Sequence, residues 1–206
     1  MVEKFMRTRW IVLAAMTMVA SALLAVGQAA GSQQAGPQQA GIDPALLAKA
    51  SAGDVAAQVA VGESYEAGKG VARDYTLAAE WYRKAAVKGD IGGEIHLAAL
   101  YRDGGKGFPR DMAQAAEWYR KAAEQGDVGA QGTLGTLYSM GQGVEQNYVE
   151  AYYWLDLAAA VKGPKQELYA ANRQMIGTHI TADELAEIQD REAAWKAAHP
   201  RPNADQ

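Results

Sequence analysis

The side chains that most often do chemistry are scarce in this chain and poorly spaced for it. The sequence has no Cys and three His, at His96, His179 and His199. Glu94 and His96 are two residues apart, which places them on different sides of a helix, and no two His have the spacing of metal ligands. No Ser lies in a Gly-x-Ser-x-Gly or Ser-x-x-Lys motif. We therefore expect no catalytic residue, no metal site and no cofactor, and we expect His96 to be an ordinary surface or half-buried histidine.

Two recurrent features look superficially like ligand sites. Glycine-rich loops occur at residues 68–70, 104–107 and 141–143, but a phosphate loop needs a preceding strand and Gly-Lys-Ser/Thr at a helix start. Trp-Tyr pairs at 81–82 and 118–119 lie at the same position of successive units. We interpret them as core residues. The alternative is a sugar-stacking platform in a protein that binds or hydrolyses cell-wall or other carbohydrate.

The charge balance is acidic. The net charge is -4, and without residues 1–29 the chain has 17 Lys+Arg and 23 Asp+Glu, a net charge of -6. Affinity for nucleic acid comes mainly from neutralising phosphates, so nucleic acid is excluded as the expected partner. The remaining acidic residues are scattered, which is typical of solvated helix faces.

The N-terminus has the pattern of an export signal. Lys4, Arg7 and Arg9 precede an uncharged apolar run over residues 10–26, and small residues follow. We predict a signal peptide over residues 1–29, with cleavage after Ala29, or alternatively after Ala30. The other interpretation is an uncleaved anchor, because 17 apolar residues are at the lower limit for spanning a bilayer. Both put the remainder outside the cytoplasm, so we expect a periplasmic or secreted protein, with residues 30–43 as a flexible linker.

Internal repetition dominates the rest of the chain. Gly-Asp occurs at 53–54, 89–90 and 126–127, and Gly163-Pro164 follows, with spacings of 36, 37 and 37 residues. The nine residues 78–86 are identical to residues 115–123. A period of this length is typical of helical repeat proteins. We predict units at about 54–89, 90–126 and 127–163.

Each unit has the pattern of two helices. The Asp of each Gly-Asp pair can cap the first helix, and small and apolar residues then recur on one helix face. A glycine loop follows, and Asp74, Asp111 or Asn147 can cap the second helix. A partial leading helix is expected at 44–52, capping helices at 165–198 and a tail at 200–206. The predicted fold class is all-α.

At these positions the chain resembles the Sel-1-like repeat family, which is related to tetratricopeptide repeats. The resemblance covers roughly residues 44–199, with Ala98, Phe108 and Asn147 as departures from the family pattern. It implies a right-handed α-α superhelix, or solenoid, with a non-enzymatic scaffold or adaptor role. Exported bacterial members typically bind proteins. The matching residues of the first unit are Ala57, Val61, Gly62, Tyr65, Gly68, Gly70, Val71, Asp74, Ala78, Trp81, Lys84, Ala85, Ala86 and Gly89.

A partner-binding surface can be placed by analogy with tetratricopeptide repeats. The first helices line the concave side of such an array, and positions off their packing face point into the groove. These positions differ between units while the packing positions repeat. We expect a protein or peptide partner there, no membrane embedding after signal cleavage, and a monomer. The predicted groove residues are Val59, Glu63, Glu66, Ile95, Ala99, Arg102, Thr136, Ser139 and Met140.

Overall fold

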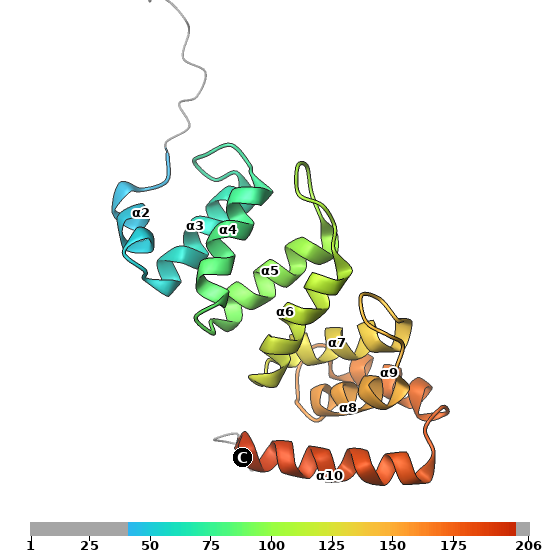
Figure 1. Ribbon diagram of the computed structural model, residues 1–206. Helices are drawn as coiled ribbons and strands as arrows, with labels where there is room; N and C mark the ends of the chain where they lie inside the picture. The colour runs from blue at the N-terminus through green and yellow to red at the C-terminus, as the bar shows by residue number, and fades with distance from the viewer. Residues whose placement is uncertain (1–40, 201–206) are drawn as a thin grey trace, which may run out of the picture. The chain divides into compact units, whose positions relative to one another are not determined.

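The computed structural model describes residues 41–200, which form helices joined by short loops (Figure 1). The predicted signal peptide and most of the linker, at residues 1–40, lie outside the described residues, as do residues 201–206 of the tail. In the described part the only β pairing is an isolated bridge between Gly105 and Phe108. The all-α solenoid expected from the sequence is confirmed. Its helices are α2 (Pro44–Ser51), α3 (Val55–Ala67), α4 (Tyr75–Ala86), α5 (Ile91–Asp103), α6 (Met112–Glu124), α7 (Val128–Met140), α8 (Tyr148–Ala159), α9 (Gln166–Gly177) and α10 (Ala182–Ala198).

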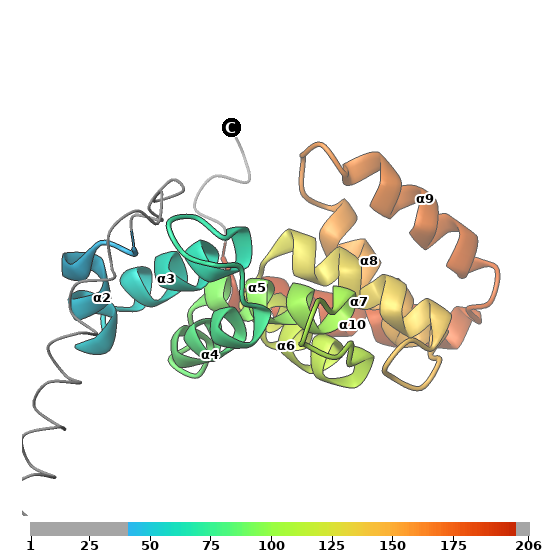
Figure 2. The same cartoon turned by 90° about the horizontal axis from the view of Figure 1, so that it is seen from above.

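Three helix pairs make up the array. α3 packs on α4, α5 on α6 and α7 on α8, and each pair also packs on the next one (Figures 1 and 2). The predicted caps are confirmed in every pair. Asp54, Asp90 and Asp127 each accept a hydrogen bond from the backbone N–H three residues later. The side chains of Asp74, Asp111 and Asn147 cap the second helices in the same way. The repeated sequence therefore sets where each helix begins.

Small residues let the two helices of a pair approach closely. A Cβ atom added to Gly62 would lie 2.6 Å from the ring of Tyr82, and one added to Gly135 would lie 2.7 Å from Cγ of Leu155. Real Cβ atoms are not found so close to carbon, because interiors are packed to crystal density. Glycine at these positions is therefore a packing requirement.

The aromatic residues of the second helices belong to the core. Trp118 is 7% exposed and Trp154 is 6% exposed, while Trp81 is half-buried. Lys84 lies 3.6 Å from the centre of the Trp81 ring, and Lys121 lies 3.8 Å from that of Trp118. Each lysine comes from the same helix as its tryptophan and covers the exposed side of the ring. The tryptophans are therefore packing residues, and in Trp81 and Trp118 a lysine lies over one face of the ring.

Polar side chains also lie inside the array, which the scattered-charge interpretation did not predict. Gln58 and Gln131 are buried, and their side-chain amides donate to the carbonyls of Ala50 and Ala123 on the preceding second helix. Glu94 has the equivalent place in the middle unit and is only 2% exposed. Its expected exposure was wrong, because this position faces the preceding pair rather than solvent.

The C-terminal end is built differently from the repeats. Tyr169 and Ile176 of α9 pack on Ala151 and Leu155 of α8. Ile188 of α10 joins the main core, which includes other residues of α8. The two last helices therefore contact different faces of α8, and they do not pack on each other as a repeat pair does (Figures 1 and 2).

Candidate partner-binding face

We use the term first-helix face for the surface formed by the nine predicted groove positions of α3, α5 and α7. The structure gives these positions different roles. Val59 and Ile95 are half-buried and pack against the main core. The hydroxyls of Thr136 and Ser139 donate to backbone carbonyls of their own helix, at 2.9 and 2.8 Å. The positions whose side chains neither pack against the core nor bond to the backbone of their own helix are fewer than predicted, and are Glu63, Glu66, Ala99, Arg102 and Met140.

An acidic corner forms where α3 meets α5, and it includes a histidine that the sequence alone did not place. Nε2 of His96 lies 3.5 Å from a carboxylate oxygen of Glu63, and its Nδ1 lies 3.7 Å from one of Glu66. The ring stacks on Tyr82 with centroids 4.7 Å apart. A neutral imidazole has a single N–H, so it can donate to only one of the two carboxylates. The two carboxylates and the imidazole between them thus form one compact group at this corner.

The Tyr82 hydroxyl holds the Glu66 carboxylate in place through a hydrogen bond. It donates to Oε2 of Glu66 across 2.5 Å. Burial, the hydrogen bond to Glu66 and the nearby carboxylate charges raise the pKa of Tyr82 far above its ordinary value. The phenol therefore stays protonated and remains a donor. Among residues 41–200 no group of three or more His, Cys, Asp and Glu side chains has a metal-binding arrangement.

Arg102 occupies the position of Glu66 in the next unit and is already paired. Its guanidinium donates to both carboxylate oxygens of Asp103, at 2.7 and 2.8 Å, and to the Tyr119 hydroxyl at 2.9 Å. The hydrogen bonds from Arg102 lower the pKa of Asp103 below its ordinary value. The charge of Arg102 is thus balanced locally. Glu63 and Glu66 are the acidic residues of the first-helix face that form no ion pair with a Lys or Arg of the described residues.

The C-terminal part of this side is apolar. Gln166 of α9 donates to the Ala159 carbonyl at 3.1 Å, as Gln131 does to Ala123, so α9 has the register of a first helix. Met140 and Met175 lie nine residues after these glutamines, at equivalent positions. They are 61% and 70% exposed, and Leu168 on α9 is 55% exposed. These three side chains are flexible or apolar groups that a partner can bury.

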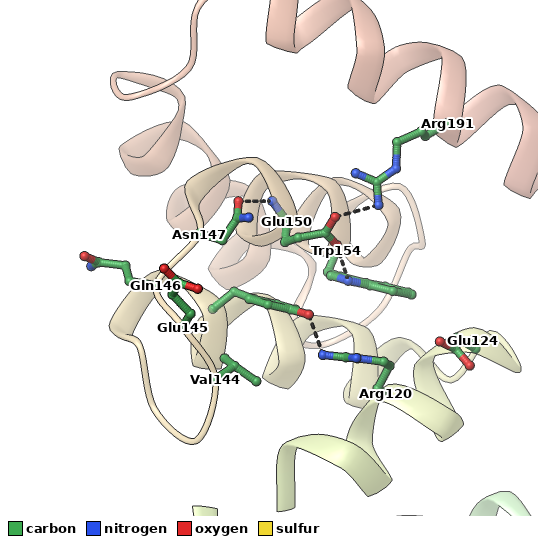
Figure 3. A pocket seen from close by; sticks show the side chains of 10 residues that line it. Arg120, Glu124, Val144, Glu145, Gln146, Asn147, Glu150, Trp154 and Arg191 are labelled. Carbon is green, nitrogen blue, oxygen red and sulfur yellow. Dashed lines mark hydrogen bonds and ion pairs between the residues drawn. The ribbon is translucent and has the colours of Figure 1, made fainter. Parts of the chain in front are cut away.

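A separate cleft of about 680 Å³ lies between α6, α8 and α10 (Figure 3). Two of the five charged side chains in its lining form an ion pair with each other. Arg191 contacts Glu150 at 2.8 Å, and Glu150 also accepts from Nε1 of Trp154 at 3.2 Å. Arg120 donates to the Tyr138 hydroxyl at 2.6 Å. None of the nine predicted residues lines this cleft, and its existence depends on how α10 packs on α8.

The contact between His96 and Glu63 was not predicted from the sequence, although the spacing of the two residues gives an indirect indication of it. Glu63 and His96 are 33 residues apart, close to one period, so they lie on neighbouring first helices. The pairing needs the stacking geometry of those helices. No described helix has the combination of length and apolar character needed to cross a membrane.

A family model and one solved structure agree with this architecture. The Sel1 repeat model matches residues 55–90, 93–127 and 130–160. A crystal structure of a Sel1 repeat protein from Oxalobacter formigenes is 36% identical, over 56% of this chain and 47% of that one, with a TM-score of 0.52. A protective antigen of uropathogenic Escherichia coli strains with an SLR fold is 25% identical, over 77% of this chain and 49% of that one, with a TM-score of 0.40.

The similarity to the solved structures covers only part of each of them. The chain spans about half the length of both solved structures. No curated protein matches it. The three matched repeats coincide with the three helix pairs, and the positions that make them pack are those of the repeat pattern. The chain therefore belongs to the Sel1 repeat family.

Proposed function

We propose that this protein is an exported, non-enzymatic scaffold that binds a protein or peptide partner on the first-helix face. Sel1 repeat proteins generally mediate protein–protein interaction and are typically non-catalytic. The observation that carries the proposal is the contrast within each unit. The packing and capping positions repeat, whereas first-helix positions off the packing face differ between units: the position of Glu66 becomes Arg102 and then Ser139. A repeated scaffold with a non-repeated surface is suited to one particular partner.

The face favours a partner segment with both basic and apolar residues. Glu63 and Glu66 present negative charge, which attracts Lys or Arg. Met140, Leu168 and Met175 offer apolar area further along the array. Burying such side chains against a partner contributes about 25 cal/mol per Å² of apolar area before the costs of association.

The sugar-binding alternative receives no support from the tryptophans. Trp118 and Trp154 are buried, and Lys84 covers Trp81. A sugar platform needs an exposed aromatic ring face. Within residues 41–200 the repeated tryptophans provide none, so we do not propose this function.

Export is the part of the proposal that rests on the N-terminal sequence. We expect the mature protein to begin at Ala30, as measured by intact-mass spectrometry of protein purified from cells that make it. A soluble species of that mass outside the cytoplasm agrees with cleavage. A full-length species that starts at Met1 in the membrane fraction contradicts it and favours the anchor.

Charge reversal tests the face itself. We expect Glu63→Lys together with Glu66→Gln to weaken partner capture by roughly five- to tenfold, equivalent to about 1–1.4 kcal/mol, because the pair removes the negative charge and the new amide oxygen at position 66 can still accept from the Tyr82 hydroxyl. Glu80→Lys is the matched control, since Glu80 is exposed on the second helix α4. Capture is measured by affinity purification after crosslinking in the native envelope. Equal capture by a folded double variant would contradict binding on this face.

A further inference from the structure

Helix α9 is a first helix without a second helix of its own. The Gln166 bond to the Ala159 carbonyl repeats the bonds of Gln58 to Ala50 and of Gln131 to Ala123. In each complete unit a second helix packs on the first, but α10 packs on α8 instead. Ala170, at the position of Gly62, is only partly buried on the side that would receive a second helix. Glu167, Ala171 and Gln174, at the positions of Val59, Glu63 and Glu66, are exposed on the side that would meet a following first helix.

Helix α2 corresponds to a second helix that has no first helix of its own among the described residues. Ile42 and Leu46 lie 36 residues before Ala78 and Tyr82, the α4 residues that pack in the complete first unit. Ile42 and Leu46 are partly buried against α3, but within residues 41–200 no first helix precedes α2 to form a pair with it. They line an open cleft of about 670 Å³ together with Ala60 and Ala67 of α3, and its charged groups are Asp43, Glu63 and Lys69. The cleft is the place that a first helix would fill.

The preceding residues of the chain are poorly suited to this cleft. Residues 30–40 contain Gly31, Gly36 and Pro37, and their other residues are Ala, Ser and Gln. Such a sequence has low helix propensity and no bulky apolar side chain to remove from water. An occupant supplied by another molecule is therefore favoured over the chain's own linker.

We propose that α9 of a second copy occupies this cleft, so that α9 of one molecule and α2 of the next complete one repeat between them. The register supports the fit. Ala170 lies four residues after Gln166, as Gly62 lies four residues after Gln58, so Ala170 would face Leu46 as Gly62 faces Tyr82. Ala171 would face Ala60 as Glu63 faces His96. Small residues at both places allow the close approach that the repeat requires.

The proposed contact is head-to-tail. One molecule gives α9 and the other gives the cleft, so every copy has one free end of each kind and association continues into an open chain or a ring. This replaces the monomer expected from the sequence. It rests on a different observation from the proposed function, but the cleft shares Glu63 with the first-helix face, so a partner bound at Glu63 and a second copy would compete for this end.

Complementation between two blocked variants tests the proposal. Ala60→Arg obstructs the cleft and leaves α9 intact, while Ala171→Arg obstructs α9 and leaves the cleft intact. Both are helix positions that solvent reaches, and Arg is a good helix former. We measure mass by light scattering on a sizing column with the mature chain at about 10 μM to about 1 mM, the range of weak association.

The wild-type mass should rise with concentration, each variant alone should stay at the monomer mass, and an equimolar mixture should stop at the dimer. The dimer limit follows because only one compatible pair of ends remains. A wild-type protein that stays monomeric throughout would overturn the proposal. So would folded variants that associate like the wild type, or a mixture that stays monomeric, because a symmetric contact or a different surface would then be responsible. Circular dichroism checks that both variants are folded.

Discussion

Glu94 has the position that glutamine occupies in the units before and after it. Gln58 and Gln131 each donate a side-chain N–H to a buried carbonyl of the preceding second helix. A carboxylate cannot donate, and Glu94 instead accepts from Nε2 of Gln125 at 2.8 Å. Burial raises the pKa of Glu94 above its ordinary value, with the Gln125 hydrogen bond opposing that rise. A proton on Glu94 would restore the missing donor.

We expect Glu94→Gln to stabilise the protein at pH 7 by about 1 kcal/mol, the typical net value of one hydrogen bond. The new amide can donate to the Ala86 carbonyl and still accept from Gln125. The free energy of unfolding is measured by urea denaturation. The raised pKa means that the folded state holds its proton at higher pH than the unfolded state, so wild-type stability falls as pH rises above the ordinary Glu range. In the Glu94→Gln variant this contribution to the pH dependence of the free energy of unfolding should be absent.

Gln131→Glu is the reciprocal control for this position. It should destabilise the protein and add a pH dependence of the same sign. If Glu94→Gln lowers stability, or if both variants leave it unchanged, the equivalence of the three positions is wrong.

At the residue scale the sequence predicts caps and glycines well. Asp54 and Asp90 cap helices as expected, because a cap acts on backbone groups within three residues. The burial of Glu94 could not be predicted in the same way. It depends on which side of α5 faces the preceding pair, and that is a property of stacking. The carboxylate neighbours of His96 were missed for the same reason.

At the element scale, a group of four charged residues joins α9 and α10 to α8. Asp156 of α8 pairs with Arg173 of α9, and Glu192 of α10 pairs with Lys196 at 3.0 Å. One oxygen of Glu192 is buried with no hydrogen-bond partner, and the Asp156 carboxyl interacts with the Glu192 carboxyl. Burial first, and then Asp156, raise the pKa of Glu192 to about 7. A proton shared by the two carboxyls supplies the missing donor below that pH.

This pair predicts a pH-dependent attachment of α10. Glu192 binds its proton more tightly in the folded state, so its contribution to stability is present at about pH 4.5 and is lost as pH rises towards 7. We expect Glu192→Gln to raise the Tm at pH 8 by a few degrees and to flatten Tm between pH 5 and 8. Thermal unfolding followed by circular dichroism measures both.

Glu187→Gln is the matched control, because Glu187 is exposed on the same helix. It should leave the pH profile unchanged. A Glu192→Gln profile as steep as that of the wild type over this range would show that the carboxyl pair does not attach α10.

The sequence predicts the existence of α10 but not its place. Thr181 and Glu184 form a complete capping box, which fixes where the helix begins. Ile188 and Trp195 lie seven residues apart on one face, which indicates packing without naming the surface. In the structure that face meets α8, and the ring of Trp195 approaches Gly126 at the end of α6. The surface on which α10 packs therefore depends on the arrangement of the other helices.

At the scale of the whole molecule, the solenoid follows from local pairings repeated along the chain. Each first helix contacts its own second helix and the neighbouring pairs, so the fold can be predicted from one period and its register. The partner cannot be predicted in this way. The surface that would bind it consists of the residues that do not repeat, such as Glu63, Arg102 and Met140, and their chemistry restricts a partner to a class.

Site-specific photocrosslinking in the native envelope tests partner binding on the first-helix face most directly. A photoreactive residue is placed at Ala99 or Ser139 on that face, and at the exposed Glu80 or Glu117 on the second helices as controls. The proposed function predicts discrete protein adducts from Ala99 and Ser139 and none of the same mass from Glu80 and Glu117. Adducts confined to the second-helix positions, or equal at all four, would contradict it.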